Sequence, residues 1–135
     1  MFDAKTLFQI GEYLRLHSNS HPYKEAMLRS SIGRYYYACY HAAKMKCINK
    51  NHWDDKNRTN HRTVVRELRD NNNELGGCLD TLRTLREHAD YHVWNCKTLS
   101  QDRREHPKCD CDWDPDTDAN CNEAARIARW IMDEI

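Results

Sequence analysis

A short polar segment in the second half of the chain combines residue types that could act on a phosphodiester. Within residues 82–92 the sequence places Arg83, Arg86, His88, Asp90, Tyr91 and His92. An arginine can hold a phosphate through its fork of donors, a histidine can transfer a proton near neutral pH, and a tyrosine can stack on a base. The same residues also fit a solvated helix face, on which Arg86 and Asp90 form an ordinary i,i+4 ion pair. The segment therefore allows a catalytic and a purely structural interpretation.

Hydrophobic periodicity indicates that this segment ends a helix. The apolar residues that recur at helical spacing are Leu75, Leu79, Leu82, Leu85 and Ala89. The helix should begin near residue 74 or 75, although Gly76 and Gly77 in its first turn weaken that start. Similar patterns predict helices over residues 4–17, 23–48, 60–70 and 119–135. The segment is therefore expected to be positioned by a helical scaffold.

The five predicted helices define the expected fold class. No part of the sequence has a convincing strand pattern, so we predict an all-α, up-and-down helical bundle in one domain spanning residues 1–135. A long irregular insert at about residues 94–118 precedes the last helix. Loops of this length are uncommon in compact domains unless they have a function or are disordered.

The helix predicted over residues 23–48 carries the main apolar stripe. Its members are Leu28, Ile32, Tyr35 or Tyr36, Cys39 and Ala43. Small residues such as Ala43 would let another helix approach closely. We expect this stripe to face the other helices.

Charge is balanced over the whole chain but unevenly distributed. The formal net charge is zero, which excludes a global field that attracts nucleic acid or membranes. Residues 109–135 hold eight acidic and two basic residues, so the remaining 108 residues carry a net charge of +6. Basic residues concentrate around Arg62 and Arg66, with His61 beside them. If the chain binds RNA, as a family resemblance described below implies, these two arginines are expected to support that binding.

The sequence predicts a cytoplasmic protein. The first residues mix charged and apolar side chains, unlike a signal peptide, and no run of about 18 apolar residues could cross a membrane. The seven cysteines are an odd number, and Cys39 and Cys47 fall in a helical pattern that suits buried thiols. We therefore expect reduced cysteines and no contact with a membrane.

The insert before the last helix contains potential metal ligands. A zinc site would use His106, Cys109, Cys111 and Cys121. The Cys-x-Cys spacing is a weak zinc signal, and no second cysteine pair follows it. A calcium loop starting at Asp112 is an alternative, but Thr117 replaces the glycine that such loops need and Pro115 interrupts it. We favour neither metal and predict a solvated acidic loop that leads into the N-terminus of the last helix.

The last helix has two candidate N-terminal caps. Asp118 or Asn120 could cap it, and Glu123 lies where a capping box would place it for Asn120.

Two sequence signatures resemble those of HEPN domains. The run from Arg29 to Lys44 resembles the family's signature helix, Arg-x-Tyr-Tyr-Ala-x-aromatic-His-Ala-Ala, and its matching residues include Arg34, Tyr36 and His41. Leu85-Arg86-x-x-Ala89-Asp90-Tyr91 resembles the second signature, and the alanine-rich last helix resembles the family's closing helix. The resemblance covers about residues 23–48 and 79–135, and the acidic, cysteine-containing insert at 95–121 is not typical of it.

The resemblance implies a fold and two alternative functions. HEPN domains are all-α bundles that often dimerise, and many are metal-independent endoribonucleases without cofactors. Those members bring an Arg-x(4–6)-His motif from each of two subunits to the dimer interface. Many act as toxins or effectors in toxin–antitoxin or other defence systems, often beside a nucleotidyltransferase antitoxin. Members without the motif act as nucleotide- or protein-binding modules. For this chain the resemblance implies a homodimer that cleaves single-stranded RNA, or an inactive binding module.

Three arginine–histidine pairs have the motif's spacing. They are Arg86–His92, Arg83–His88 and Arg34–His41. Arg34 and His41 share one face of a helix but are separated by about 10 Å of rise, which suits structural roles within the bundle or at its seam. Arg86 and His92 would point about 120° apart on a continuous helix, so they converge only if the helix ends near Tyr91.

We predict Arg86 and His92 as the catalytic pair and Arg83 and His88 as the second choice. Asp90 and Tyr91 would support RNA binding beside them. The residue after Arg86 is Glu87, whereas the family often has Asn, Asp or His there. An acid beside a phosphate site is unfavourable unless it points away, and this keeps the inactive binding module as the alternative.

Overall fold

The described part of the chain forms a bundle of five α-helices. The computed structural model describes residues 3–51, 60–91 and 116–135. The helices are α1 (Ala4–Leu16), α2 (Lys24–Asn51), α3 (His61–Asn71), α4 (Asn73–Tyr91) and α5 (Thr117–Glu134), and the described residues contain no strand. No described helix is long and apolar enough to cross a membrane. The predicted all-α class is confirmed. The predicted insert lies outside the described residues except for its last three, which cap and begin α5.

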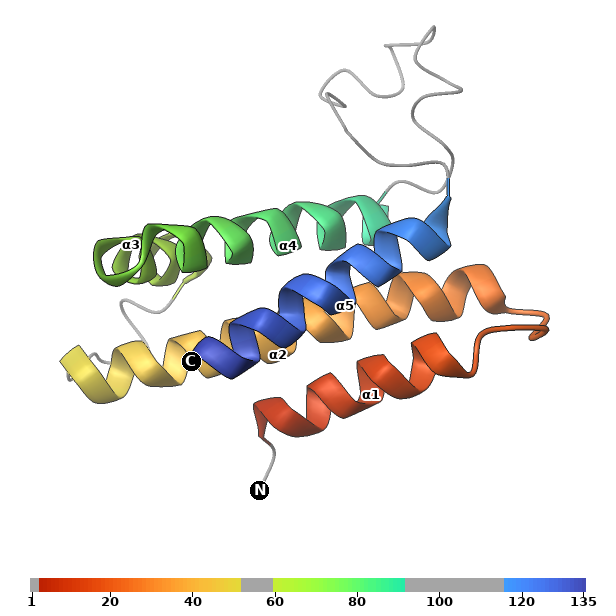
Figure 1. The fold of residues 1–135 in the computed structure, drawn as a ribbon, viewed down its shortest axis with the longest axis horizontal. Coiled ribbons are helices and arrows are strands. Elements are labelled where there is room, and N and C mark those ends of the chain that lie inside the picture. The colour runs from red at the N-terminus through yellow and green to blue at the C-terminus, as the bar shows by residue number, and fades with distance from the viewer. Residues whose placement is uncertain (1–2, 52–59, 92–115) are drawn as a thin grey trace, which may run out of the picture.

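Helix α2 is the central element of the bundle. It packs against each of the other four helices, with α1 and α3 on different sides of it (Figure 1). The long helices α1, α2, α4 and α5 run in alternating directions, which confirms the up-and-down arrangement (Figure 1). Among the described helices, α3 contacts α2 and α4 and no other, so these two helices set its position.

The predicted apolar stripe of α2 forms the core. Ile32, Cys39 and Ala43 are fully buried, and Leu28 is 2% exposed. The sequence left open which tyrosine joins this stripe, and the structure buries both Tyr35 and Tyr36. Consecutive residues on a helix project about 100° apart. Adjacent tyrosines therefore face different neighbours.

The two buried tyrosines mark the two sides of α2. The Tyr35 ring lies 5.5 Å from the ring of Phe8 on α1, and its hydroxyl accepts a hydrogen bond from Arg15 Nε at 3.0 Å. The Tyr36 hydroxyl lies 2.8 Å from Nδ1 of His61 on α3. Helix α2 thus contributes one tyrosine hydroxyl on the side that faces α1 and one on the side that faces α3.

Side chains cap the helix ends next to the predicted site. Asn60 forms a capping box with Thr63 at the start of α3. Arg29 Nη1 donates to the carbonyl oxygens of His88 at 3.4 Å and Ala89 at 3.0 Å in the last turn of α4. A cation there satisfies carbonyls that have no partner within the helix and opposes the negative end of its dipole. Arg29 thereby fixes the end of α4 to α2.

The N-terminus of α5 differs from the sequence prediction. The cap is Asp116, whose Oδ1 accepts from the backbone N–H of Asp118 at 3.0 Å and of Ala119 at 3.4 Å. Neither Asp118 nor Asn120 is the cap, because the helix begins at Thr117. Glu123 does not form a capping box with Asn120 either, since its carboxylate binds Arg126 at 2.6 and 2.9 Å.

Candidate functional site

The guanidinium of Arg86 is held between α4 and α2. Its central carbon lies 5.1 Å from the ring centre of Tyr36 and 5.8 Å from that of Tyr37, within the range of cation–π attraction. Only 14% of the side chain is exposed. Arg86 Nη1 lies 3.4 Å from Asp90 Oδ2, and Nη2 lies 4.0 Å from Glu87 Oε1. Two rings and two carboxylates therefore fix the orientation of this cation.

The bonding of Arg86 is incomplete in one respect. Its Nε is buried and makes no hydrogen bond to any described residue. Burial alone would lower the pKa of Arg86, but the nearby Tyr37 and the hydrogen bond to Asp90 raise that pKa overall. The guanidinium is thus a permanent charge with loose ionic contacts. Such a group suits an anion that can compete with those contacts.

A chain of three polar side chains holds the Tyr36 ring beneath Arg86. The Tyr36 hydroxyl contacts His61 Nδ1 at 2.8 Å, and His61 Nε2 lies 3.2 Å from Asp80 Oδ1 on α4. Burial raises the pKa of Tyr36 to about 12, so the phenol stays protonated. Burial also lowers the pKa of His61, against the opposing effect of the Asp80 hydrogen bond. The neutral imidazole can accept from the phenol while donating to the carboxylate.

Further aromatic side chains surround this contact. The Tyr36 and Tyr40 rings stack at 5.9 Å, and Tyr40 lies 5.6 Å from His41. The Tyr37 and His41 ring centres are 6.4 Å apart. We call Tyr36, Tyr37, Tyr40, His41, His61 and Arg86 the Arg86 cluster. It joins α2, α3 and α4, and Tyr37 is 37% exposed at its surface.

The structure describes one member of the first predicted catalytic pair. Arg86 lies in the cluster, whereas His92 lies outside the described residues, directly after the last residue of α4. The second pair does not converge within one chain. Helix α4 is continuous from Arg83 to His88, so these side chains project about 140° apart. An Arg83 and a His88 could then reach one phosphate only if they came from two different subunits.

The third arginine–histidine pair lies on one continuous helix. Arg34 is exposed on α2, which excludes a place within the bundle and leaves its expected alternative, a place at the seam. His41 is half-buried, with its ring beside Tyr37 and Tyr40. Tyr36 is the buried member of the signature, with 4% exposure.

The predicted supporting residues separate into two groups. Asp90 holds Arg86, and Tyr91 is 70% exposed at the end of α4. Arg62 and Arg66 are exposed on α3 and line a hollow between α3 and α4. Arg83 lines the same hollow, so it lies between the two groups.

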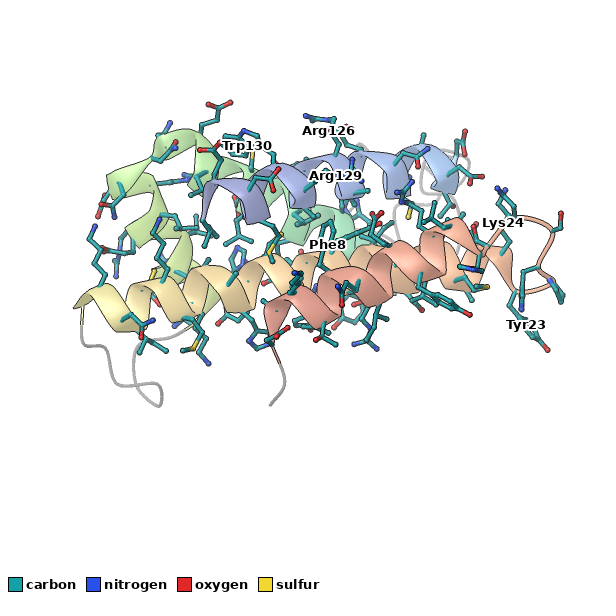
Figure 2. The ribbon with its side chains drawn as sticks, turned by 60° about the horizontal axis from the view of Figure 1, so that its bottom comes forward. Phe8, Tyr23, Lys24, Arg126, Arg129 and Trp130 are labelled. Atoms are coloured by element: carbon teal, nitrogen blue, oxygen red, sulfur yellow. The ribbon has the colours of Figure 1, made fainter. Side chains whose placement is uncertain are left out.

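Of the predicted zinc ligands, only Cys121 is described. Its side chain is fully buried in the core, where burial raises the pKa of the thiol. His106, Cys109 and Cys111 lie outside the described residues. No cluster of three or more potential metal ligands occurs in the part of the chain that the structure describes. The described residues of the calcium alternative have other partners, since Asp116 caps α5 and Asp118 pairs with Lys24 at 2.9 Å (Figure 2).

Sequence reasoning identified Asp90 as a partner of Arg86 but not the tyrosine rings that hold its guanidinium. Tyr37 was not singled out, and the contact of His61 with Asp80 spans two helices. A signal existed for the hollow, because Arg62, Arg66 and Arg69 recur at i, i+4 and i+7 on one face of α3. The link between His61 and Tyr36 had no local signal, since 25 residues separate them.

A comparison of this chain with known protein families, curated proteins and solved structures finds no match. The chemistry of the site therefore rests on its own geometry.

Proposed function

We propose that this chain is a metal-independent endoribonuclease of the HEPN type. It would act in the cytoplasm as a homodimer on single-stranded RNA, as the toxin or effector of a toxin–antitoxin or other defence system. A nucleotidyltransferase-type antitoxin is the expected class of protein partner. Arg86 and His92 of each subunit would meet at the dimer interface, with Asp90 and Tyr91 beside them.

The observation that carries this proposal is the placement of Arg86. Its guanidinium is held on the rings of Tyr36 and Tyr37, six residues before His92 in the sequence. An oriented cation that need not reorganise stabilises charge that develops in a transition state. A phosphorane-like transition state, in which negative charge gathers on the non-bridging oxygens, has this requirement.

The proposed reaction needs one proton acceptor and one proton donor. A histidine takes the proton of the ribose 2′-OH while the 2′-oxygen forms a bond to phosphorus. The bond from phosphorus to the 5′-oxygen breaks, and the histidine of the second subunit protonates that oxygen. The products are a 2′,3′-cyclic phosphate and a 5′-hydroxyl. Single-stranded RNA is the expected substrate, because in-line attack requires backbone freedom that an A-form duplex denies.

A second function is favoured by the carboxylates around Arg86. Asp90 and Glu87 both lie within 4.0 Å of the guanidinium and partly neutralise it. If these contacts persist in solution, Arg86 acts as a structural cation. The chain would then be an inactive HEPN-type module that binds a nucleotide or a protein.

The end groups of RNA distinguish these two functions. Purified protein would be incubated with total RNA in the presence of EDTA, and the products would be assayed for 2′,3′-cyclic phosphate ends. The nuclease proposal expects cleavage with these ends. RNA that remains intact at all protein concentrations would reject the nuclease and leave the binding module.

A further inference from the structure

The hollow between α3 and α4 has an excess of positive charge. Its volume is about 560 Å³, and four arginines line it: Arg62, Arg66 and Arg69 from α3, and Arg83 from α4. The lining also includes the carboxylates of Asp70 and Asp80. With His61 neutral, the formal charge of the lining is therefore +2. This surface is more basic than the chain as a whole, whose net charge is zero.

The arginines of the hollow differ in how they are bound. Arg69 Nη2 lies 3.8 Å from Asp80 Oδ2, and Arg83 Nε lies 3.0 Å from Glu87 Oε1. Arg62 and Arg66 are exposed, and neither forms an ion pair with another residue in the described ranges. The Asp80 carboxylate also contacts His61 Nε2 on α3 at 3.2 Å, so its charge is shared between His61 and Arg69. The outer part of the hollow thus presents two guanidinium groups that an anion could engage.

Close packing of the two helices shapes the hollow. A Cβ atom on Gly76 would lie 2.9 Å from the carbonyl oxygen of Val65 and 3.0 Å from the backbone nitrogen of Arg69. Gly76 therefore lets α4 approach the backbone of α3 next to Arg69. This approach places Arg83 of α4 beside the arginines of α3. The glycine that weakens the helix in isolation thus helps to assemble the basic surface.

The lining indicates the class of ligand. Apart from the imidazole of His61, no aromatic ring contributes to the hollow, so the described lining offers little on which a base could stack. Guanidinium groups match phosphate oxygens in geometry and charge. We infer that this hollow is a phosphate-binding site that holds the backbone of an RNA strand next to Arg86. Naming RNA as the source of the phosphate rests on the proposed function.

Proximity to Arg86 supports this assignment. Arg83 and Arg86 are one helical turn apart, so about 4.5 Å of rise separates them along α4. A strand whose scissile phosphate lies at Arg86 could therefore place a neighbouring phosphate in the hollow. Contacts to flanking phosphates orient the reacting one without touching it. The hollow would thus govern binding of the strand and not the chemical step.

The test uses an RNA that cannot be cleaved. A fluorescent single-stranded oligonucleotide with 2′-O-methyl riboses lacks the nucleophile, so its binding is measured independently of catalysis. The variant Arg62→Gln/Arg66→Gln removes two positive charges from the hollow. The matched control Arg126→Gln/Arg129→Gln removes two positive charges from α5, which has no contact with α3 in the described structure (Figure 2). Circular dichroism would verify that both variants fold.

The salt dependence of binding gives the expected result. Each phosphate contact on a single strand contributes about −0.7 to the slope of log K against log salt concentration. We expect the hollow variant to bind more weakly, with a slope reduced in magnitude by about 1.4, and the control to retain the wild-type slope. Inorganic phosphate and uridine monophosphate serve as competitors. If both competitors displace the oligonucleotide only weakly, the hollow binds an RNA strand. If either one displaces it at a concentration similar to that of the oligonucleotide, the assignment to RNA is overturned.

Two further outcomes would overturn the site itself. If the hollow variant and the α5 control lose the same affinity for the oligonucleotide, binding depends only on the net charge of the protein. Unchanged binding in the hollow variant would mean that the RNA binds elsewhere. Failure of the proposed function gives a different result. A protein that binds the oligonucleotide through the hollow but leaves natural RNA intact has this site and is not a nuclease.

Discussion

The two sides of α2 both bring an arginine to a tyrosine, but they complete the contact differently. Towards α1, Arg15 donates to the Tyr35 hydroxyl at 3.0 Å and to both carboxylate oxygens of Glu12 at 3.1 and 3.2 Å. The Tyr35 hydroxyl donates to the same carboxylate. Burial would raise the pKa of Glu12, but the hydrogen bonds from Tyr35 and Arg15 lower it overall. Asn122 and Arg129 of α5 complete this group, since Arg15 Nη1 donates to Asn122 Oδ1 at 3.5 Å and Arg129 Nη2 lies 3.6 Å from Glu12 Oε1.

Towards α4, Arg86 lies on tyrosine rings instead of their hydroxyls. Its closest carboxylate contact is 3.4 Å, and its Nε makes no hydrogen bond to a described residue. The adjoining hollow carries two more arginines than aspartates. A closed network stabilises the fold, whereas an open one can accept an anion. We therefore expect the α1 side to stabilise the fold, and we propose that the side of α3 and α4 carries the function.

A charge at Ala43 should disrupt the networks on both sides of α2 together. Ala43 lies on α2 and is fully buried in the hydrophobic core. Because an unpaired buried charge is costly, Ala43→Glu should leave the chain unfolded. Far-ultraviolet circular dichroism measures this directly. A soluble and fully helical variant would show that the core stripe is placed on the wrong face.

Removing one carboxylate from each side should separate the two networks. Glu12→Ala removes the acceptor of the Tyr35 hydroxyl and of Arg15 Nη2, and it should lower the free energy of unfolding by about 2 kcal/mol. Asp90→Ala removes an exposed i,i+4 partner of Arg86 and should cost less than about 0.5 kcal/mol. Urea denaturation gives both values. Equal losses would contradict the division into a closed and an open network.

The two adjacent glycines test the packing that shapes the hollow. Gly76→Ala would force the α3 backbone to move, and overpacking of this kind costs about 1–3 kcal/mol. At Gly77 a Cβ would meet no atom within 4 Å, so Gly77→Ala should stabilise the protein by about 0.5–1 kcal/mol. Thermal unfolding of the two single variants makes this comparison. The same sign for both changes would refute the close approach of α4 to α3.

The smallest expected effect is a pH dependence of stability that arises from His61, on the Arg86 side of α2. Burial lowers the pKa of His61 in the folded state, and the positive charge of Arg83 lowers it further, although Asp80 and Glu87 oppose both. As the pH falls below the ordinary histidine value of 6.5, the unfolded chain therefore takes up the proton first. Stability should be complete above this pH and should decrease below it.

The variant His61→Gln isolates this contribution. Glutamine keeps one donor and one acceptor but does not titrate. Between pH 7 and pH 5, urea denaturation should show a greater loss of stability for the wild type than for the variant. An identical loss would place the pH dependence elsewhere in the molecule.

The sequence predicted the helices and the core of α2 because these depend on local periodicity. The stripe from Leu28 to Ala43 follows the helical repeat, and both tyrosines at its centre are apolar enough to be buried. The N-terminal cap of α5 lies earlier in the sequence than predicted, because Asp116, Asp118 and Asn120 are all residue types that favour a cap. Sequence spacing alone does not decide between such neighbours.

The candidate site was predictable only in part. The sequence singled out Arg86, and its pairing with Asp90 follows from i,i+4 spacing. The ring contacts of Arg86 and the contact between His61 and Asp80 depend on how three helices pack. The role of Gly76 was also hidden, because its lack of a side chain matters only when α3 lies against it.

The cleavage rate of Arg86→Ala relative to Arg126→Ala tests the central claim most directly. Both changes remove one arginine, but only Arg86 lies in the cluster, and Arg126 is 68% exposed on α5. With a single-stranded RNA and EDTA, loss of a transition-state donor should lower the rate of 2′,3′-cyclic phosphate formation by about 10²–10³-fold in Arg86→Ala. Arg126→Ala should cleave at the wild-type rate. Equal rates for the two folded variants would contradict a catalytic role for Arg86.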